Sequence, residues 1–175
     1  MIIGITGKAG CGKTTASFIL GYPVVSFASP LKSMIASLLE SVEQDADRCM
    51  KGDLKESPIP ALGGRTPRFL MQTLGTEWGR NIVAENLWTD LGIKRAMDIH
   101  RRRRCHVVID DVRFDNEVVA IVEAGGVIVN ITGRGGIAGS HASEKVPDFA
   151  HHFIENSGTK EEFQQKVRAL RVKLK

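Results

Sequence analysis

Short apolar runs alternate with longer amphipathic stretches along the whole chain. The continuous apolar runs predict five buried strands, at residues 1–6, 23–27, 106–110, 127–132 and 152–155. Apolar residues at helical spacing predict helices, at residues 13–20, from 30 to beyond 39, from 67 to about 75, 86–104, 116–124 and from 160 to about 174. Strands that alternate with helices form mostly parallel sheets covered by helices on both faces. We therefore expect an α/β fold with a mostly parallel five-stranded sheet.

Residues typical of helix starts support these boundaries. Ser29 and Thr66 each precede a proline, so we expect both to cap helices whose first position is the proline. Thr159 and Glu162 have the spacing of a capping box at the start of the last helix. The apolar positions expected to face the core are Leu31, Met34, Ile35, Leu38 and Leu39 in the second helix, Val118, Ile121 and Val122 in the fifth, and Phe163, Val167, Leu170 and Leu174 in the last.

Length and composition are those of one globular domain over residues 1–175, because 42% of the residues are apolar and 25% are charged. No apolar run approaches the roughly 20 residues of a membrane-spanning helix, and the first residues lack a signal-peptide pattern. Cys11, Cys49 and Cys105 form no CxxC pair, which favours a reducing compartment. We expect a cytoplasmic protein without a membrane partner.

The net charge of +4 comes from one place in the chain. Arg101 to Arg104 supply four positive charges, and the remaining 20 basic residues balance the 20 acidic ones. Such a run usually forms a solvated helix end, where cations suit the dipole. Contact with a phosphate is the alternative, but we expect no stable nucleic-acid binding.

Residues 7–14, GKAGCGKT, match the phosphate-binding pattern G-x-x-x-x-G-K-[ST], and we call them the phosphate loop. Glycines let such a loop turn several backbone N–H groups toward one anion, and the next helix adds its positive dipole end. We expect Lys13 to reach the β- and γ-phosphates and Thr14 to ligate Mg²⁺. The residues expected to bind ATP here are Gly7, Ala9, Gly10, Cys11, Gly12, Lys13, Thr14 and Thr15. A chance match is the alternative, but the flanking strand and helix favour the phosphate loop.

An apolar strand ends in Asp110 and Asp111, and carboxylates at that edge of a parallel sheet face the ligand crevice. Either could hold Mg²⁺ through water or receive the second substrate; a simple strand-end turn is the alternative. The sequence alone does not choose between them; we take Asp110 as the candidate metal ligand and Asp111 as the candidate catalytic and substrate-binding residue. Arg113 is expected beside the phosphate loop, or in a surface ion pair with Glu117.

Three arginines, Arg65, Arg68 and Arg80, flank the helix that begins at residue 67. Guanidinium groups bind phosphate oxygens in bidentate fashion, so the three could clamp a second, phosphorylated substrate; solvated surface positions are the alternative. Trp78 and Trp88 could stack on a base, but tryptophans are more often core residues, and we expect this of Trp88.

A glycine-rich segment follows the fourth strand at residues 133–145 and carries Arg134, His141 and Glu144. It could close over a site as a lid (residues 133–150), with Arg134 neutralising a transferring phosphoryl group. A flexible loop without that role is the alternative, and His141 could equally be a structural hydrogen-bonding residue.

The chain resembles the bacteriophage-type deoxynucleoside monophosphate kinases, within the P-loop kinase superfamily. The blocks that carry the resemblance are GITGKAGCGKTT at the start, SFASPLK at 26–32, TPRFLMQTLGTEWGR at 66–80, DVRFDNE at 111–117, HASE at 141–144 and IENSGT at 154–159. The first block is generic to the superfamily, whereas the third and fourth are more specific. Residues 41–64 match no part of the pattern.

The resemblance implies a three-layer α/β/α P-loop NTPase fold and transfer of the ATP γ-phosphoryl group to a deoxynucleoside monophosphate, with Mg²⁺. The acceptor-binding helical region lies at about residues 30–105. By the resemblance, the residues that bind the monophosphate are Arg68, Gln72, Glu77, Trp78 and Arg80, and those that line the centre are Asp111, Arg113 and Glu117. We add Arg65 and Glu144 as further candidate substrate-binding residues, and Asp111 and Arg113 as candidate catalytic residues. Asn156 and Gly158 belong to a segment that resembles the adenine-side loop of related kinases.

The sequence thus favours a cytoplasmic, Mg²⁺-dependent deoxynucleoside monophosphate kinase, in the host cytoplasm if it is phage-encoded. The alternatives are a kinase of another small phosphorylated metabolite, such as dephospho-coenzyme A, a nucleic-acid-dependent ATPase, and a nucleotide-binding switch without catalysis. The sequence is also compatible with a homodimer.

Overall fold

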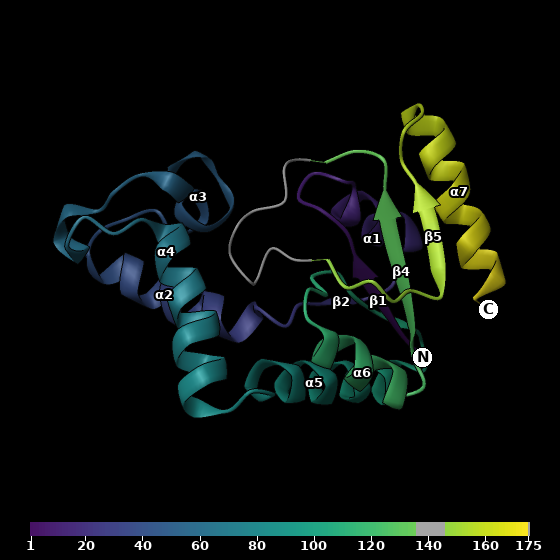
Figure 1. Cartoon of the computed structure of the whole chain (residues 1–175), viewed down its shortest axis with the longest axis horizontal. Coiled ribbons are helices and arrows are strands. Elements are labelled where there is room, and N and C mark those ends of the chain that lie inside the picture. Colours follow the sequence, from purple (N-terminus) through teal and green to yellow (C-terminus); the bar gives the residue numbers. More distant parts are fainter. Residues whose placement is uncertain (136–145, 175) are drawn as a thin grey trace. The chain divides into compact units, whose positions relative to one another are not determined.

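The computed structural model describes residues 1–135 and 146–174 (Figure 1). The chain forms two compact units. Unit 1 contains Met1–Phe27 and Thr89–Lys175, and unit 2 contains Ala28–Trp88. In the described part of the chain, no helix is long and apolar enough to cross a membrane.

Unit 1 is built on a parallel sheet whose described strands all run in one direction. Figure 1 shows β1, β4 and β5 side by side with their arrows aligned. The strands are β1 (Ile2–Thr6), β2 (Val24–Val25), β3 (Val107–Ile109), β4 (Val127–Thr132) and β5 (His152–Glu155), in the order β2-β3-β1-β4-β5. The five predicted strands are confirmed, although β2 and β3 are shorter than their apolar runs.

Helices cover both faces of this sheet. They are α1 (Lys13–Leu20), α5 (Leu87–Arg103), α6 (Asp115–Glu123) and α7 (Lys160–Lys173). On one face, apolar residues of α1 and α7 pack on Ile3 and Ile5 of β1. On the other, residues of α5 and α6 pack on Ile2. Alternate residues of a strand face opposite sides, so β1 divides the two cores, and a three-layer α/β/α arrangement results.

Unit 2 is helical around a small core of its own. Its elements are α2 (Ser29–Ser41), α3 (Ala46–Lys51), the 3₁₀ turns η1 (Asp53–Glu56) and η2 (Pro60–Leu62), α4 (Pro67–Gln72) and the π-helix η3 (Thr73–Val83). The buried residues that they share are Ile35, Leu39, Cys49, Met50 and Ile59. Unit 2 ends at Trp88, because α5 carries Ala96 into the core of unit 1. The acceptor-binding region at about residues 30–105 stays a prediction.

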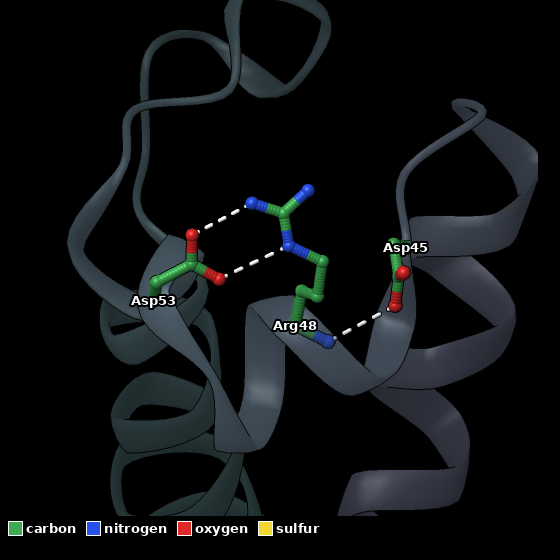
Figure 2. Close-up of polar contacts among 3 residues, drawn as sticks. All are labelled: Asp45, Arg48 and Asp53. Carbon is green, nitrogen blue, oxygen red and sulfur yellow. Dashed lines mark hydrogen bonds and ion pairs between the residues drawn. The ribbon is translucent and has the colours of Figure 1, made fainter.

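A fork-shaped ion pair lies in the part of unit 2 that matched no family block (Figure 2). Asp45 caps α3 by accepting the backbone N–H of Arg48 at 3.0 Å. The guanidinium of Arg48 then donates Nε–H and Nη2–H to the two carboxylate oxygens of Asp53, at 3.0 and 2.6 Å. These bonds lower the pKa of Asp53. The same region also contains two 3₁₀ turns and a bridge between Ile59 and Arg65.

Helix boundaries agree with the sequence where a local signal specified them. Thr66 caps α4, and Thr159 and Glu162 form the predicted capping box of α7. Ser29, in contrast, lies inside α2, whose cap is Ala28. The helix that begins at Pro67 does not end near Gly75, because the chain continues helically through η3.

Some predicted core positions are exposed. In α2 the buried stripe is Leu31, Ile35 and Leu39, whereas Met34 and Leu38 are 45% and 40% exposed. Val122 of α6 is likewise exposed at 39%. Helical periodicity gives the centre of an apolar face, but the packing partner decides its width. The predicted inward residues of α7 are all buried.

Candidate nucleotide-binding site

The phosphate loop leaves the sheet directly after the buried strand β1 and leads into α1 at Lys13. This strand–loop–helix order is the context that the sequence pattern requires. Gly7, Gly10 and Gly12 have positive φ angles of 138°, 77° and 109°. A Cβ on Gly7 would collide with the carbonyl oxygen of Ile131 and lie 2.7 Å from Cys11 Sγ. Only glycine therefore fits at position 7, from both its backbone angle and its surroundings.

Cys11 is a buried residue of the phosphate loop. Its side chain is fully buried in the core shared with α1 and α7. It can therefore serve a nucleotide only through its backbone. The side chains of Thr14 and Thr15, in contrast, are exposed in the first turn of α1, where a helix presents N–H groups and a positive dipole end to an anion.

Lys13 extends back over its own loop. Its Nζ donates hydrogen bonds to the carbonyl oxygens of Gly7 and Lys8, at 2.7 and 2.8 Å. Burial lowers the pKa of this ammonium, and Arg113 acts in the same direction, while Asp110 and Asp111 raise it. The ammonium therefore lies within electrostatic range of charged residues that follow β3. Their common role at the centre of a site stays a prediction.

The carboxylate of Asp111, after β3, accepts two hydrogen bonds from a neighbouring segment. Asp111 accepts the hydroxyl of Ser26 at 2.5 Å on Oδ2 and the backbone N–H of Phe27 at 2.9 Å on Oδ1. Ser26 and Phe27 directly follow β2, so Asp111 ties together the ends of two neighbouring strands. Its assigned role in catalysis stays a prediction, as does that of Asp110 in metal binding.

Glu117 holds the turn that carries Arg113. Its Oε2 accepts the backbone N–H groups of Arg113 and Phe114, at 2.7 and 3.1 Å, and the residue is only 3% exposed. The bond between Arg113 and Glu117 thus uses the backbone of Arg113. Glu117 shapes the segment between β3 and α6, whereas its direct contact with substrate stays a prediction.

Two further loops pack against the phosphate loop. A Cβ on Gly135 would lie 2.7 Å from the carbonyl oxygen of Ala9, and one on Gly133 would lie 2.9 Å from Ser157 N. Arg134 donates to the carbonyl oxygen of Gly158 at 2.7 Å. The segments predicted as lid and adenine-side loop therefore meet beside the phosphate loop. His141 and Glu144 lie outside the described residues.

Six of the predicted acceptor residues lie in unit 2, on α4, on η3 or just before α4: Arg65, Arg68, Gln72, Glu77, Trp78 and Arg80. Arg65 places its guanidinium 4.6 Å from the ring centre of Phe69, a cation–π contact. Arg68 forms an ion pair with Glu56. Arg80 donates to the carbonyl oxygen of Glu85 at 3.2 Å.

Gln72 is the last residue of α4, and the π-helix η3 that follows contains Glu77 and Trp78. Trp78 is 40% exposed and lies 6.3 Å, ring centre to ring centre, from Trp88. Trp88 is buried and donates its indole N–H to the carbonyl oxygen of Gly75 at 2.8 Å. The expectation of a core role for Trp88 is confirmed. π-helices often mark functional segments, which is consistent with the predicted role of this stretch.

Oxygen donors suited to Mg²⁺ are present in unit 1, although the described residues contain no cluster of three or more His, Cys, Asp or Glu side chains. Mg²⁺ in phosphoryl-transfer sites is usually held by one or two protein oxygens, with water and phosphate oxygens completing the shell. The hydroxyl of Thr14 and the carboxylate of Asp110 fit that donor set.

Two comparisons with known proteins agree with this arrangement. A family model described as deoxynucleotide monophosphate kinase matches residues 65–167. A protein of Acanthamoeba polyphaga mimivirus, provisionally assigned as a deoxynucleotide monophosphate kinase, is 34% identical over 161 residues, covering 82% of this chain and 80% of the viral protein.

The chain belongs to the deoxynucleotide monophosphate kinase family. This confirms the resemblance drawn from the sequence blocks. It also supports a phosphotransferase of deoxynucleotide metabolism. The part of the chain that matches the kinase family model includes both the arginine-bearing helices of unit 2 and the segments around Asp111, Arg134 and Asn156.

Two residues make contacts that no sequence pattern predicts. Ser26 lies in one of the family blocks, but only its bond to Asp111 indicates what it does. Phe163 was predicted as a core residue, and its ring also lies beside Gly12, where an added Cβ would approach Cε1 to 3.2 Å. Their partners are distant in the sequence, so no local pattern marks either contact.

Proposed function

We propose that the protein is an ATP- and Mg²⁺-dependent kinase that transfers the γ-phosphoryl group of ATP to a deoxynucleoside monophosphate, yielding ADP and the deoxynucleoside diphosphate. One observation carries the proposal: in a member of this kinase family, Lys13 bonds to the carbonyl oxygens of its phosphate loop and lies within electrostatic range of charged residues after β3. Such a reaction needs positioning and charge stabilisation more than covalent chemistry.

Unit 1 contains the residues that would bind ATP, the phosphoryl donor. The loop glycines and the start of α1 would cradle the phosphates of ATP. The Lys13 ammonium would leave its carbonyl partners for the β- and γ-phosphate oxygens, which are stronger acceptors because they are charged. Mg²⁺, held by Thr14 and Asp110, would neutralise charge on the transferring group.

Arg134 is suited to a role in charge stabilisation. Its bond to the Gly158 carbonyl oxygen is exposed and uses one of five guanidinium N–H groups. The remaining donors can therefore bind a phosphoryl oxygen while that bond keeps the side chain beside the adenine-side loop.

The arginines of unit 2 would bind the deoxynucleoside monophosphate, the phosphoryl acceptor. Arg68 is paired with Glu56 at a surface position, and surface ion pairs contribute only about 0–1 kcal/mol. A doubly charged monophosphate can displace such a carboxylate at little cost. Trp78 is partly exposed, so its ring could stack on a base, and the buried ring of Trp88 lies 6.3 Å from it.

A panel assay tests the function. The protein is incubated with Mg-ATP and, separately, each common deoxynucleoside and ribonucleoside monophosphate, and ADP release is measured. We expect ADP release to depend on one or more deoxynucleoside monophosphates. Absence of acceptor-dependent ADP with every monophosphate would contradict the proposal.

The same assay distinguishes the alternatives. ADP release that requires dephospho-coenzyme A would indicate a kinase of another phosphorylated metabolite. Hydrolysis stimulated by DNA without an acceptor would indicate a nucleic-acid-dependent ATPase. A protein that binds ATP and turns over none of these substrates would be a nucleotide-binding switch.

A further inference from the structure

One buried hydrogen bond in the candidate donor site joins two residues that lie far apart in the sequence. The side-chain Nδ2 of Asn156 donates to the backbone carbonyl oxygen of Cys11 at 2.8 Å, across 145 positions of sequence. Asn156 is 8% exposed, so solvent cannot easily replace either partner. If a buried carbonyl oxygen loses its hydrogen-bond donor, nothing offsets the free-energy cost of removing that oxygen from water.

The bond orients a particular peptide unit of the phosphate loop. The carbonyl of Cys11 and the N–H of Gly12 belong to the same peptide, and in a trans peptide these two groups point in opposite directions. Holding the Cys11 carbonyl oxygen toward Asn156 therefore turns the Gly12 N–H away from the protein interior. In a phosphate loop that outward direction is the one in which anions are bound.

This peptide needs such a restraint because it precedes a glycine. Gly12 has φ of +109°, and a glycine at that position tolerates many other backbone angles. A rotation of the peptide would replace a donor by a carbonyl oxygen on the phosphate side, which would repel an anion. Neighbouring groups leave little space there, since a Cβ on Gly12 would lie 2.8 Å from Asn156 Nδ2.

Asn156 is itself well anchored. Its backbone N–H donates to the carbonyl oxygen of Thr132 at 2.8 Å, which extends the pairing of β4 and β5 by one residue. The sheet therefore determines where the amide group lies. An amide on a rigid strand end can hold a flexible glycine-containing loop more precisely than another loop could.

We propose that Asn156 is a positioning residue of the donor site, which keeps the Cys11–Gly12 peptide in the orientation that binds the triphosphate of ATP. This differs from a direct contact between the Asn156 side chain and adenine. It rests on the proposed function, because it assumes that the phosphate loop binds ATP.

Inorganic tripolyphosphate is the probe that separates these two roles, because it carries the phosphates of ATP without the nucleoside. Its affinity and that of ATP are measured by calorimetry, with Mg²⁺, for the wild type and for Asn156→Leu and Asn156→Asp. Leu has a similar volume and no donor. Asp has no donor when ionised and regains one when protonated. Glu155→Gln, an exposed neighbour, is the control.

We expect Asn156→Leu to weaken tripolyphosphate and ATP by the same factor, about tenfold or more, at every pH. Asn156→Asp should be as weak near neutral pH and should approach the wild type as the pH falls from about 8 to about 5.5, because burial raises the pKa of the introduced carboxyl. In steady-state assays, the KM for ATP should rise while the KM for the acceptor changes less than about twofold. Glu155→Gln should match the wild type.

Three results would overturn the inference or its foundation. Normal tripolyphosphate affinity in both variants would refute the positioning role and leave the proposed function intact. Loss of ATP affinity with normal tripolyphosphate affinity would show that Asn156 contacts the nucleoside instead. A wild-type protein that binds neither ATP nor tripolyphosphate would refute the proposed function, and the inference with it.

Discussion

The hydroxyl of Ser26 donates a hydrogen bond to the carboxylate of Asp111, 85 positions away in the sequence. The bond joins the segments that follow β2 and β3. Asp111 therefore has a structural role at this edge of the sheet. The same is true of Glu117, whose carboxylate accepts hydrogen bonds from two backbone N–H groups.

Removing the Ser26 hydroxyl tests this structural role. We expect Ser26→Ala to lower the free energy of unfolding by about 1 kcal/mol, because the bond is charge-assisted but only partly buried. Urea unfolding measures the change, with an unchanged m-value. Ser37→Ala removes an exposed hydroxyl that bonds to the backbone of its own helix, and it should change the free energy of unfolding by less than about 0.5 kcal/mol. Equal effects of the two substitutions would contradict the role given to the Ser26–Asp111 bond.

Lys13 should matter for catalysis far more than for stability. Lys13→Ala removes the ammonium that would neutralise the β- and γ-phosphates, and we expect turnover to fall at least about a hundredfold. Folding should be nearly unaffected, because burial already disfavours the charged form, as the lowered pKa shows. Steady-state kinetics and thermal unfolding measure the two effects. Lys173→Ala, at the end of α7, is the control, and near-normal turnover of Lys13→Ala would remove the phosphate loop from the mechanism.

Gly79 is required by the indole of Trp88. A Cβ at Gly79 would lie 2.6 Å from Trp88 Cε2, so we expect Gly79→Ala to destabilise unit 2 by roughly 1–3 kcal/mol. Gly75→Ala is the matched control in the same π-helix, because its Cβ would meet only Leu31 Cδ2 at 3.4 Å. That control should be neutral or stabilising by up to about 1 kcal/mol. Chemical unfolding followed by tryptophan fluorescence measures both, and a neutral Gly79→Ala would show that Trp88 is not tightly packed there.

His106 should make stability depend on pH. Burial lowers its pKa, and the nearby positive charges of the Met1 amino group and His100 act in the same direction. The unfolded chain, with an ordinary histidine pKa near 6.5, then takes up the proton first as the pH falls. Stability is therefore lost on acidification from about pH 7 to below the lowered pKa.

Unfolding midpoints of the wild type and His106→Gln, measured across that pH range, test this prediction. The glutamine variant should lose part of the dependence, because it has no titrating ring. His152→Gln, on the edge strand β5, should keep it. Identical pH profiles of the wild type and His106→Gln would exclude His106 as the cause.

The sequence by itself determined the features that depend on neighbours within a few residues. The apolar runs gave the strands, the capping residues Thr66 and Thr159 gave two helix starts, and GKAGCGKT gave the phosphate loop between a strand and a helix. These succeed because backbone angles and first-turn hydrogen bonds are set locally. The family blocks added the kinase family, which the comparisons confirmed.

Only the tertiary structure decided which distant groups meet. Asp111 with Ser26, and Asn156 with Cys11, are joined because parallel strands bring their ends to one sheet edge, whatever their separation along the chain. The exposure of Met34 depends on the width of the surface against which α2 packs. Periodicity contains no information on either, because it records the direction of a side chain and not its partner.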